Sequence, residues 1–269
     1  MDDCLSSSAN VSIEYHAMHL GYQNIKCQRI PHNYMILHSS KHHNNNNNFL
    51  QKIENNYSKT IDAILNHQYL SALEKKQISK EKLQILVYEQ YHIIKNDRRN
   101  FALMISKASD DAATELFTDC LSAEVKALEN LAPMAEELGI NHIISDSDNK
   151  IELYEPLAGC HAYTNYLTKL AVYGSDAEIL AAILVDFPIW GANCSKISSF
   201  LKKNYGFTER SCIFLDQFAT PLPEKFIGKS NNLITRFNLA QKERVIQRAA
   251  RLILDYELLF WDTIYKHSI

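Results

Sequence analysis

The sequence predicts an all-α protein, a bundle of about seven or eight helices. From about residue 56 onward, apolar residues recur at the helical spacings of three, four and seven, and no strand-type alternation persists. Only 7 Gly and 6 Pro occur in 269 residues, which is few for a fold that needs many tight turns. Long helices with few turns between them are therefore the expected architecture.

The chain changes character at about residue 55. Residues 1–55 are of mixed polarity and contain His42 and His43 followed by the asparagine tract 44–48. Such a tract cannot bury enough apolar surface to offset the entropy lost on ordering. We expect residues 1–55 to be a polar N-terminal extension and residues 56–269 to be one helical domain.

The first three helices are marked by their ends. Apolar residues between Ile61 and Leu73 give a first amphipathic helix. Ser79 suits the N-cap of a second, and Asp110 suits the N-cap of a third. Gly139 suits the C-cap of that third helix.

Prolines, glycines and apolar segments predict the positions of the later helices. Pro156 opens a fourth helix, which runs to Gly174. Asp176 begins a fifth, which is apolar on nearly all sides in its first half, so we expect it to be the central helix. Pro188 lies inside it and predicts a kink. Two short helices follow, and the last long helix spans about residues 238–266.

Composition narrows the class of protein. The formal net charge of -3 and the pI near 6.4 give no basic footprint for nucleic acid. Six scattered cysteines with no C-x-x-C pair favour reduced thiols. The N-terminus lacks the pattern of a signal peptide, and no run reaches the apolar length of a membrane span. We expect a cytoplasmic protein that binds neither nucleic acid nor membranes.

Several polar side chains fall on faces that should be buried. Glu257 lies on the apolar stripe of the last helix with Ile253 and Phe260, and a buried carboxylate is costly unless something pairs or uses it. The other inward polar residues are Gln90, Asp97, Glu124, Tyr163 and Asn193. With neighbouring aromatic residues such as Phe187 and Trp190, they describe a pocket for a flat, partly polar molecule.

Each of these residues also has a structural interpretation. Glu124 could be the buried partner of a tyrosine or an arginine, and Gln90 could be a satisfied core amide. Cys194, also on an apolar face, could be an inert buried thiol. The number of inward polar groups in one bundle favours a pocket, because packing alone does not need so many.

A metal site is an alternative. Glu89 and His92 form a Glu-x-x-His pair, the element that diiron bundles use, and Glu124 and His161 could add ligands. The second Glu-x-x-His of the ferritin-like pattern does not occur, and Glu89 and His92 fall beside the apolar stripe. No P-loop, G-x-G-x-x-G, G-x-S-x-G or H-E-x-x-H motif occurs either.

Four segments resemble the TenA family, the thiaminase-II-like proteins with the heme-oxygenase-like helical fold, over about residues 56 to 266. The segments are Ser79–Gln90, Glu124 ahead of the Glu-Glu-Leu-Gly-Ile of residues 136–140, Ala162–Leu167 and Tyr256–Trp261. The resemblance implies a homodimer or homotetramer that needs no cofactor and binds a small thiamine-like or pyrimidine-like molecule. It implies that Glu257 is the acid/base group and that Tyr163 lines the pocket. We assign Gln90, Glu124, Phe187 and Trp190 to the same pocket.

The sequence departs from the family pattern at two positions. Gln90 stands where the family has a pyrimidine-binding aspartate, and Pro188 stands where it has its nucleophilic cysteine, two residues before Trp190. The diiron members of the same fold need ligands at positions where this chain has Asn96 and Asn165. Thiaminase II activity is therefore in doubt, and a diiron oxidase or a non-catalytic interaction protein remain alternatives.

Overall fold

A computed structural model describes residues 48–140, 154–237 and 242–267. Within these ranges the regular structure is entirely helical, which confirms the predicted fold class. The helices are α1 (Asn48–Leu65), α2 (Gln68–Glu74), α3 (Lys80–Lys107), α4 (Asp111–Glu137), α5 (Ala158–Tyr173), α6 (Asp176–Phe200), α7 (Ile213–Ala219), α8 (Glu224–Phe237) and α9 (Glu243–Lys266). A short π-helical turn, η4 (Leu201–Tyr205), continues α6.

The helical part of the chain begins earlier than the predicted boundary. Helix α1 starts at Asn48, so it includes residues that we had assigned to the N-terminal extension. Residues 1–47, with His42, His43 and most of the asparagine tract, lie outside the described residues.

Side-chain caps fix the start of the long helices. Ser79 Oγ accepts from Lys82 N at 3.3 Å, and Asp110 Oδ1 accepts from Ala113 N at 2.9 Å. Helix α6 begins at Asp176, as expected, and Ser175 caps it through a reciprocal capping box with Glu178.

Helix α6 is the centre of the bundle. It packs against α1, α5, α7, α8 and α9, and its buried residues cover nearly every side of the helix. The segment Asp176–Tyr205 is long and apolar enough to cross a membrane, but 72% of its most apolar window is buried among the other helices. Burial on all sides accounts for its hydrophobicity, since a core helix has no face in water.

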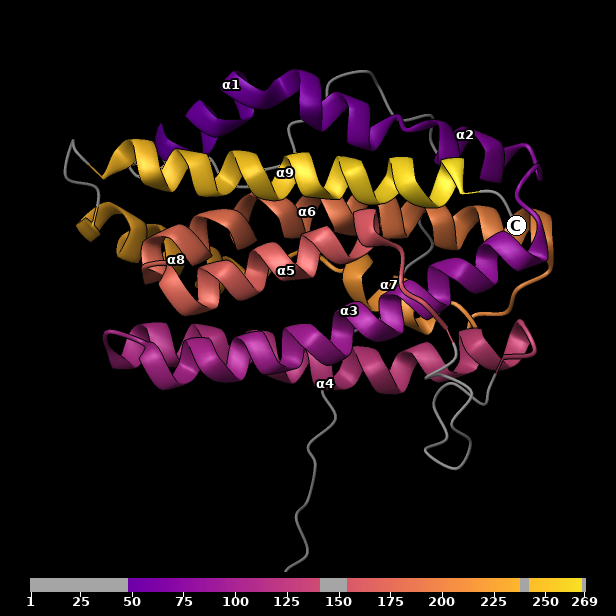
Figure 1. The fold of residues 1–269 in the computed structure, drawn as a ribbon, viewed down its shortest axis with the longest axis horizontal. Helices are drawn as coiled ribbons and strands as arrows, with labels where there is room; N and C mark the ends of the chain where they lie inside the picture. Colours follow the sequence, from indigo (N-terminus) through magenta and orange to yellow (C-terminus); the bar gives the residue numbers. More distant parts are fainter. Residues whose placement is uncertain (1–47, 141–153, 238–241, 268–269) are drawn as a thin grey trace, which may run out of the picture. The chain divides into compact units, whose positions relative to one another are not determined.

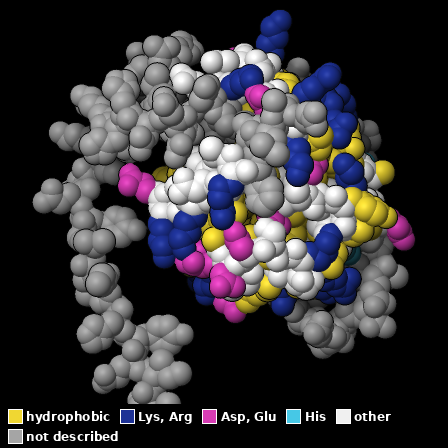
Figure 2. Space-filling model, turned by 90° about the vertical axis from the view of Figure 1, so that its left-hand side faces the viewer, with side chains coloured by type: hydrophobic (Ala, Val, Ile, Leu, Met, Phe, Trp, Pro, Cys, Tyr) yellow, Lys and Arg dark blue, Asp and Glu magenta, His cyan; other side chains and the backbone are white. Residues whose placement is uncertain are grey.

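The other helices form layers around α6 (Figure 1). Helices α3 and α4 run side by side on one side of the bundle, and α1 lies against α9 on the opposite side. Helix α5 bridges the two sides because it contacts both α3 and α9. On the end of the molecule shown in Figure 2, Lys and Arg side chains are interspersed with acidic and apolar ones.

Candidate functional site

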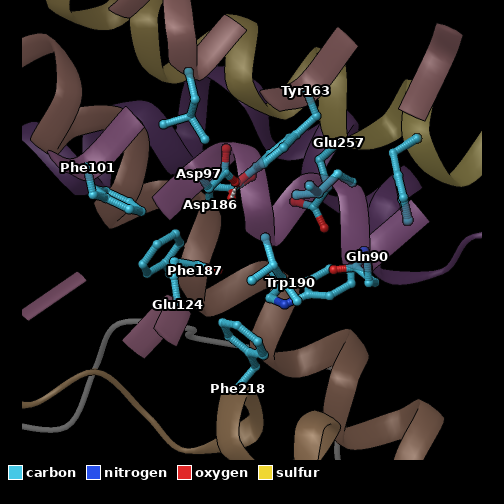
Figure 3. Close-up of a pocket in the computed structure, with 14 residues that line it drawn as sticks. Gln90, Asp97, Phe101, Glu124, Tyr163, Asp186, Phe187, Trp190, Phe218 and Glu257 are labelled. Carbon is cyan, nitrogen blue, oxygen red and sulfur yellow. Dashed lines mark hydrogen bonds between the residues drawn. The ribbon is translucent and has the colours of Figure 1, made fainter. Parts of the chain in front are cut away.

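A cavity lies between α3, α4, α5, α6, α7 and α9, and polar side chains from five of these helices line it (Figure 3). It encloses about 570 Å³ of empty space, part of which is open to solvent. Its polar lining residues are Gln90, Asp97, Glu124, Tyr163, Asp186 and Glu257. Its apolar lining residues are Ile93, Ile94, Phe101, Leu167, Phe187, Trp190, Phe218 and Phe260.

The structure brings together all six residues that we assigned to the pocket from the sequence. Glu257, Gln90, Glu124, Tyr163, Phe187 and Trp190 all line this cavity. Asn193, which we also expected to point inward, lies elsewhere in the core, where its Nδ2 donates to Ile64 O at 3.3 Å. It therefore ties α6 to α1 and does not line the cavity.

Glu257 is almost completely buried, at 2% exposure. Trp261 Nε1 donates to its Oε1 at 3.2 Å, while its Oε2 meets no donor among the described residues. Burial raises the pKa of Glu257 well above its usual value, and the negative charge of Asp186 raises it further. Glu257 is thus a carboxylic acid that keeps its proton near neutral pH.

Asp186 is the carboxyl group next to Glu257. Tyr163 Oη donates to Asp186 Oδ2 at 2.6 Å, and Asp186 Oδ1 is buried without a donor. Burial raises the pKa of Asp186 to about 6, although the hydrogen bond from Tyr163 acts in the opposite direction. Of the two neighbouring carboxyl groups, Glu257 has its pKa raised by the charge of Asp186 as well as by burial, so Glu257 is the one that holds a proton while Asp186 is ionised.

A second pair of carboxyl groups comes from α3 and α4. Asp97 Oδ1 accepts from Thr164 Oγ1 and, at 3.1 Å, from Asn100 Nδ2. Burial raises the pKa of Asp97 to about 7. Burial also raises the pKa of Glu124 well above its usual value, the charge of Asp97 adds to this, and Arg98 partly offsets it.

The titratable side chains that line the cavity are therefore all acidic. Four carboxyl groups face the cavity, and none of the residues that line it is Lys, Arg or His. Aromatic rings form much of the remaining wall: the Trp190 ring lies edge-on to Phe260 at 6.1 Å and to Phe218 at 6.2 Å between centroids. Carboxyl groups and aromatic faces both attract cations and N–H donors.

Comparison with known proteins agrees with this architecture. Residues 54–267 match the TENA/THI-4/PQQC family. The chain belongs to the TENA/THI-4/PQQC family.

Two curated proteins similar to this family member are both named aminopyrimidine aminohydrolase. One, from Helicobacter pylori, is 21% identical over 213 residues, covering 75% of this chain and 91% of that protein. The other, from Halalkalibacterium halodurans, is 29% identical over 124 residues, covering 46% of this chain and 53% of that protein.

Several solved structures share the fold. A TenA homologue from Pseudomonas syringae superposes with a TM-score of 0.69 at 13% identity, covering 81% of this chain and 93% of that one. A TenA homologue from Pyrococcus furiosus has a TM-score of 0.64 at 21% identity, covering 81% and 100%. A Shewanella denitrificans domain described as having a heme oxygenase-like fold has a TM-score of 0.61 at 16% identity, covering 81% and 92%.

Helix α6 of this TENA/THI-4/PQQC member contributes Asp186, Phe187 and Trp190 to the cavity, and the last two were expected there. Pro188, the position that we matched to the family cysteine, is not among the lining residues, whereas Asp186 and Phe187 are. Sequence reasoning missed Asp186. The available signal was its position as the lone charge between Ile179 and Trp190, in the most apolar helix.

No cysteine in the described part of the chain lines the cavity. Cys120, Cys160, Cys194 and Cys212 are all buried and unpaired. Cys194, which follows Trp190 by one helical turn, is completely buried, and burial raises the pKa of its thiol well above the usual value. A thiol in this state is a poor nucleophile, because the thiolate is the reactive form.

The alternative metal ligands are not assembled in this family member. Glu124 lines the cavity, whereas Glu89 Oε1 accepts from Tyr154 Oη at 2.5 Å and from Leu157 N at 2.8 Å. The rings of His92 and His161 are 6.2 Å apart between centroids. In residues 48–140, 154–237 and 242–267, no group of three or more His, Cys, Asp and Glu side chains could hold a metal ion.

The position of Glu89 differs from the expected one. We expected it beside the apolar stripe of α3, but it is completely buried, because the segment that leads into α5 packs over α3 at this point. Since Leu157 is the N-cap residue of α5, Glu89 holds the start of that helix against α3. Glu89 therefore positions α5 through its Oε1, while its Oε2 has no partner among the described residues.

Proposed function

We propose that the cavity binds a small aminopyrimidine-like heterocycle and hydrolyses the bond between carbon and an amino group on it. The observation that carries the proposal is the pair of unpartnered carboxyl oxygens, Glu257 Oε2 and Asp186 Oδ1, on residues that line one cavity. Buried polar atoms without partners are rare, and in a cavity they are free for a ligand. The names of the two curated relatives support the same substrate class.

The raised pKa values assign complementary roles to the two carboxyl groups. Glu257 retains its proton and serves as the general acid that protonates the leaving amine. Asp186 has a pKa of about 6, so it is largely ionised at neutral pH and serves as the general base that takes a proton from water. Two carboxyl groups whose environments separate their pKa values commonly divide acid and base roles in this way.

The step balances without a cofactor. The oxygen of water forms a bond to carbon while the carbon–nitrogen bond breaks, and the amine leaves as ammonia. Asp186 receives the proton of the water, and Glu257 supplies the proton to the amine. Because Asp186 is the stronger acid of the two, its proton returns to Glu257 after the ammonia has left. This route uses water directly and does not require a cysteine.

Ammonia release tests the proposal. A suitable substrate is 4-amino-5-aminomethyl-2-methylpyrimidine, an amine built on the pyrimidine half of thiamine. We expect ammonia release by the wild-type protein, and a loss of about 10² to 10⁴ in kcat for Asp186→Asn, the range typical of a general base. The control is Glu129→Gln, an exposed residue of α4 paired with Lys126.

A thermal-shift measurement with the same pyrimidine, made beside the ammonia assay, separates catalysis from binding. A thermal shift with this pyrimidine but no ammonia release would mean that the cavity binds without hydrolysing. If the pyrimidine causes no thermal shift and no ammonia is released, the proposed substrate class is wrong.

A further inference from the structure

The cavity contains more carboxyl groups than the proposed hydrolysis uses. Glu257 and Asp186 account for one pair, and Asp97 and Glu124 form another, held by α3 and α4. In Figure 3, Asp97 and Asp186 lie next to each other, with Glu124 near Phe187 on one side of the cavity and Glu257 and Gln90 on the other side. The carboxyl groups therefore form a row, and its Glu124 end is a second place where positive charge is favoured.

Glu124 is built into the cavity without a partner. Its side chain is only 7% exposed, it lines the cavity, and it makes no hydrogen bond to any described residue. The basic group that acts on it is Arg98, which is not a lining residue. A carboxyl group buried for structure alone should instead have a cation or several donors, because burying it unpaired is costly.

Asp97 is oriented by its neighbours. Thr164 and Asn100 both donate to its Oδ1, which fixes the side chain. Asn100 Nδ2 is itself within 3.3 Å of Thr164 O, so the support is a closed buried network. A fixed acid beside an unpartnered one is a preorganised acceptor site.

The groups around this second pair favour an organic cation. Phe101 and Phe187 supply aromatic surface at the same side of the cavity, which suits an ammonium group carried on an apolar frame. A metal ion is not favoured, because no third His, Cys, Asp or Glu among the described residues joins these two carboxyl groups as a possible ligand.

We propose that Asp97 and Glu124 form a cation subsite, and that the ligand of the cavity carries on one flat frame both a positively charged nitrogen group for this subsite and the amino group that is hydrolysed. The amino group binds at Glu257 and Asp186, and the charged group binds at Asp97 and Glu124. This inference deepens the proposed function and rests on it for the first of the two positions. It defines the substrate class as small aromatic diamines and excludes neutral heterocycles as preferred ligands.

The test compares two probes that differ by one ammonium group. Benzylamine has one, and 1,4-bis(aminomethyl)benzene has two on the same ring; the 1,3-isomer covers a shorter spacing. Their dissociation constants are measured by isothermal titration calorimetry at pH 7.5. We expect the better diamine to bind the wild-type protein at least about tenfold more tightly than benzylamine, as an added charge-assisted hydrogen bond predicts.

Two variants test whether Asp97 and Glu124 cause the preference for the diamine over benzylamine. Glu124→Gln should bring the two dissociation constants to within about threefold of each other. Glu129→Gln, the same substitution on the outer side of the same helix, should keep the full preference. Asp97→Asn, which preserves the acceptor for Thr164 and Asn100, provides a second test should Glu124→Gln not fold.

Three results overturn the inference: equal binding of the monoamine and the diamines, a preference that survives both variants, or no binding of any probe. The ammonia assay reports on the proposed function separately. If ammonia is released but the diamine preference is absent, only the second subsite is wrong. If the preference depends on Glu124 and no ammonia is released, the subsite stands and the hydrolysis is wrong.

Discussion

The Tyr163 hydroxyl donates to Asp186 Oδ2 across 2.6 Å and joins α5 to α6 at the edge of the cavity. This bond holds Asp186 with its second oxygen free of donors and beside Glu257. It also favours the ionised form of Asp186, because a hydroxyl donor stabilises a carboxylate. Tyr163 thus positions the proposed general base and sets its acidity, in addition to lining the cavity.

Tyr163→Phe should therefore move the pH dependence of catalysis. Removing the donor raises the pKa of Asp186, since the hydrogen bond from Tyr163 lowers it in the native protein. Because a general base must be ionised, the rising limb of kcat against pH should shift upward, by about one pH unit. An unshifted limb in the ammonia assay would mean that Asp186 is not the base.

Asp97→Asn should stabilise the fold at neutral pH. The pKa of Asp97 is about 7 in the folded protein, against 3.8 as its ordinary value, so between these values the folded state binds a proton that the unfolded state has lost. The contribution of Asp97 to the free energy of unfolding is therefore most favourable below about pH 4, and it becomes less favourable as the pH rises towards 7. Asparagine removes this penalty, and we expect a gain on the order of 1 to 3 kcal/mol at pH 7.5.

Urea unfolding at pH 5.5 and 7.5 measures this effect. The gain should be larger at pH 7.5 than at pH 5.5, and the exposed control Asp119→Asn should show neither the gain nor its pH dependence. A loss of stability at both pH values would contradict the assignment of Asp97 as a buried, costly carboxyl group.

Gly191→Ala should disturb the wall of the cavity. A Cβ at Gly191 would lie 2.5 Å from Phe218 O, so α7 would have to move away from α6. Overpacking of this kind costs about 1 to 3 kcal/mol, and displacing Phe218 should also weaken ligand binding. Thermal unfolding and calorimetry check the two effects.

Gly228→Ala is the matched control for Gly191→Ala. Gly228 lies in α8 with nothing within 4 Å of the added methyl group. The substitution should therefore stabilise the protein slightly, by about 0.4 to 1 kcal/mol, and leave ligand affinity unchanged. If both glycine variants behave alike, the close approach of α7 to α6 has no special role.

Cys194→Ala should leave ammonia release within about threefold of wild type, because a completely buried thiol with a raised pKa is not a nucleophile. Iodoacetamide should likewise fail to modify Cys194 in the folded protein. Loss of activity with an unchanged thermal unfolding temperature would instead point to covalent catalysis through this cysteine.

Local signals predicted the fold well. Ser79 and Asp110 are N-caps because their side chains reach backbone N–H groups within one turn, and Gly139 adopts a positive φ of 73° that favours glycine. These helix ends depend on a few neighbouring residues and can therefore be predicted from the sequence.

The site was harder to predict because burial there depends on distant segments. Glu257 stood out on an amphipathic helix, but Asp186 lies in a helix that is buried on all sides, where periodicity does not distinguish one face from another. Glu89 was misplaced because the segment leading into α5 covers it, and no local pattern in α3 shows that contact. Matching Pro188 to a family cysteine by its spacing from Trp190 gave a residue outside the cavity lining.

The most direct test of the account is ammonia release by Glu257→Gln with 4-amino-5-aminomethyl-2-methylpyrimidine. Glutamine keeps the size and the acceptor for Trp261 but cannot donate an acidic proton. We predict that kcat falls by about 10² to 10⁴ while the dissociation constant changes little, as expected for removal of a general acid. An unchanged kcat would contradict the assignment of Glu257 as the acid on which the proposed reaction depends.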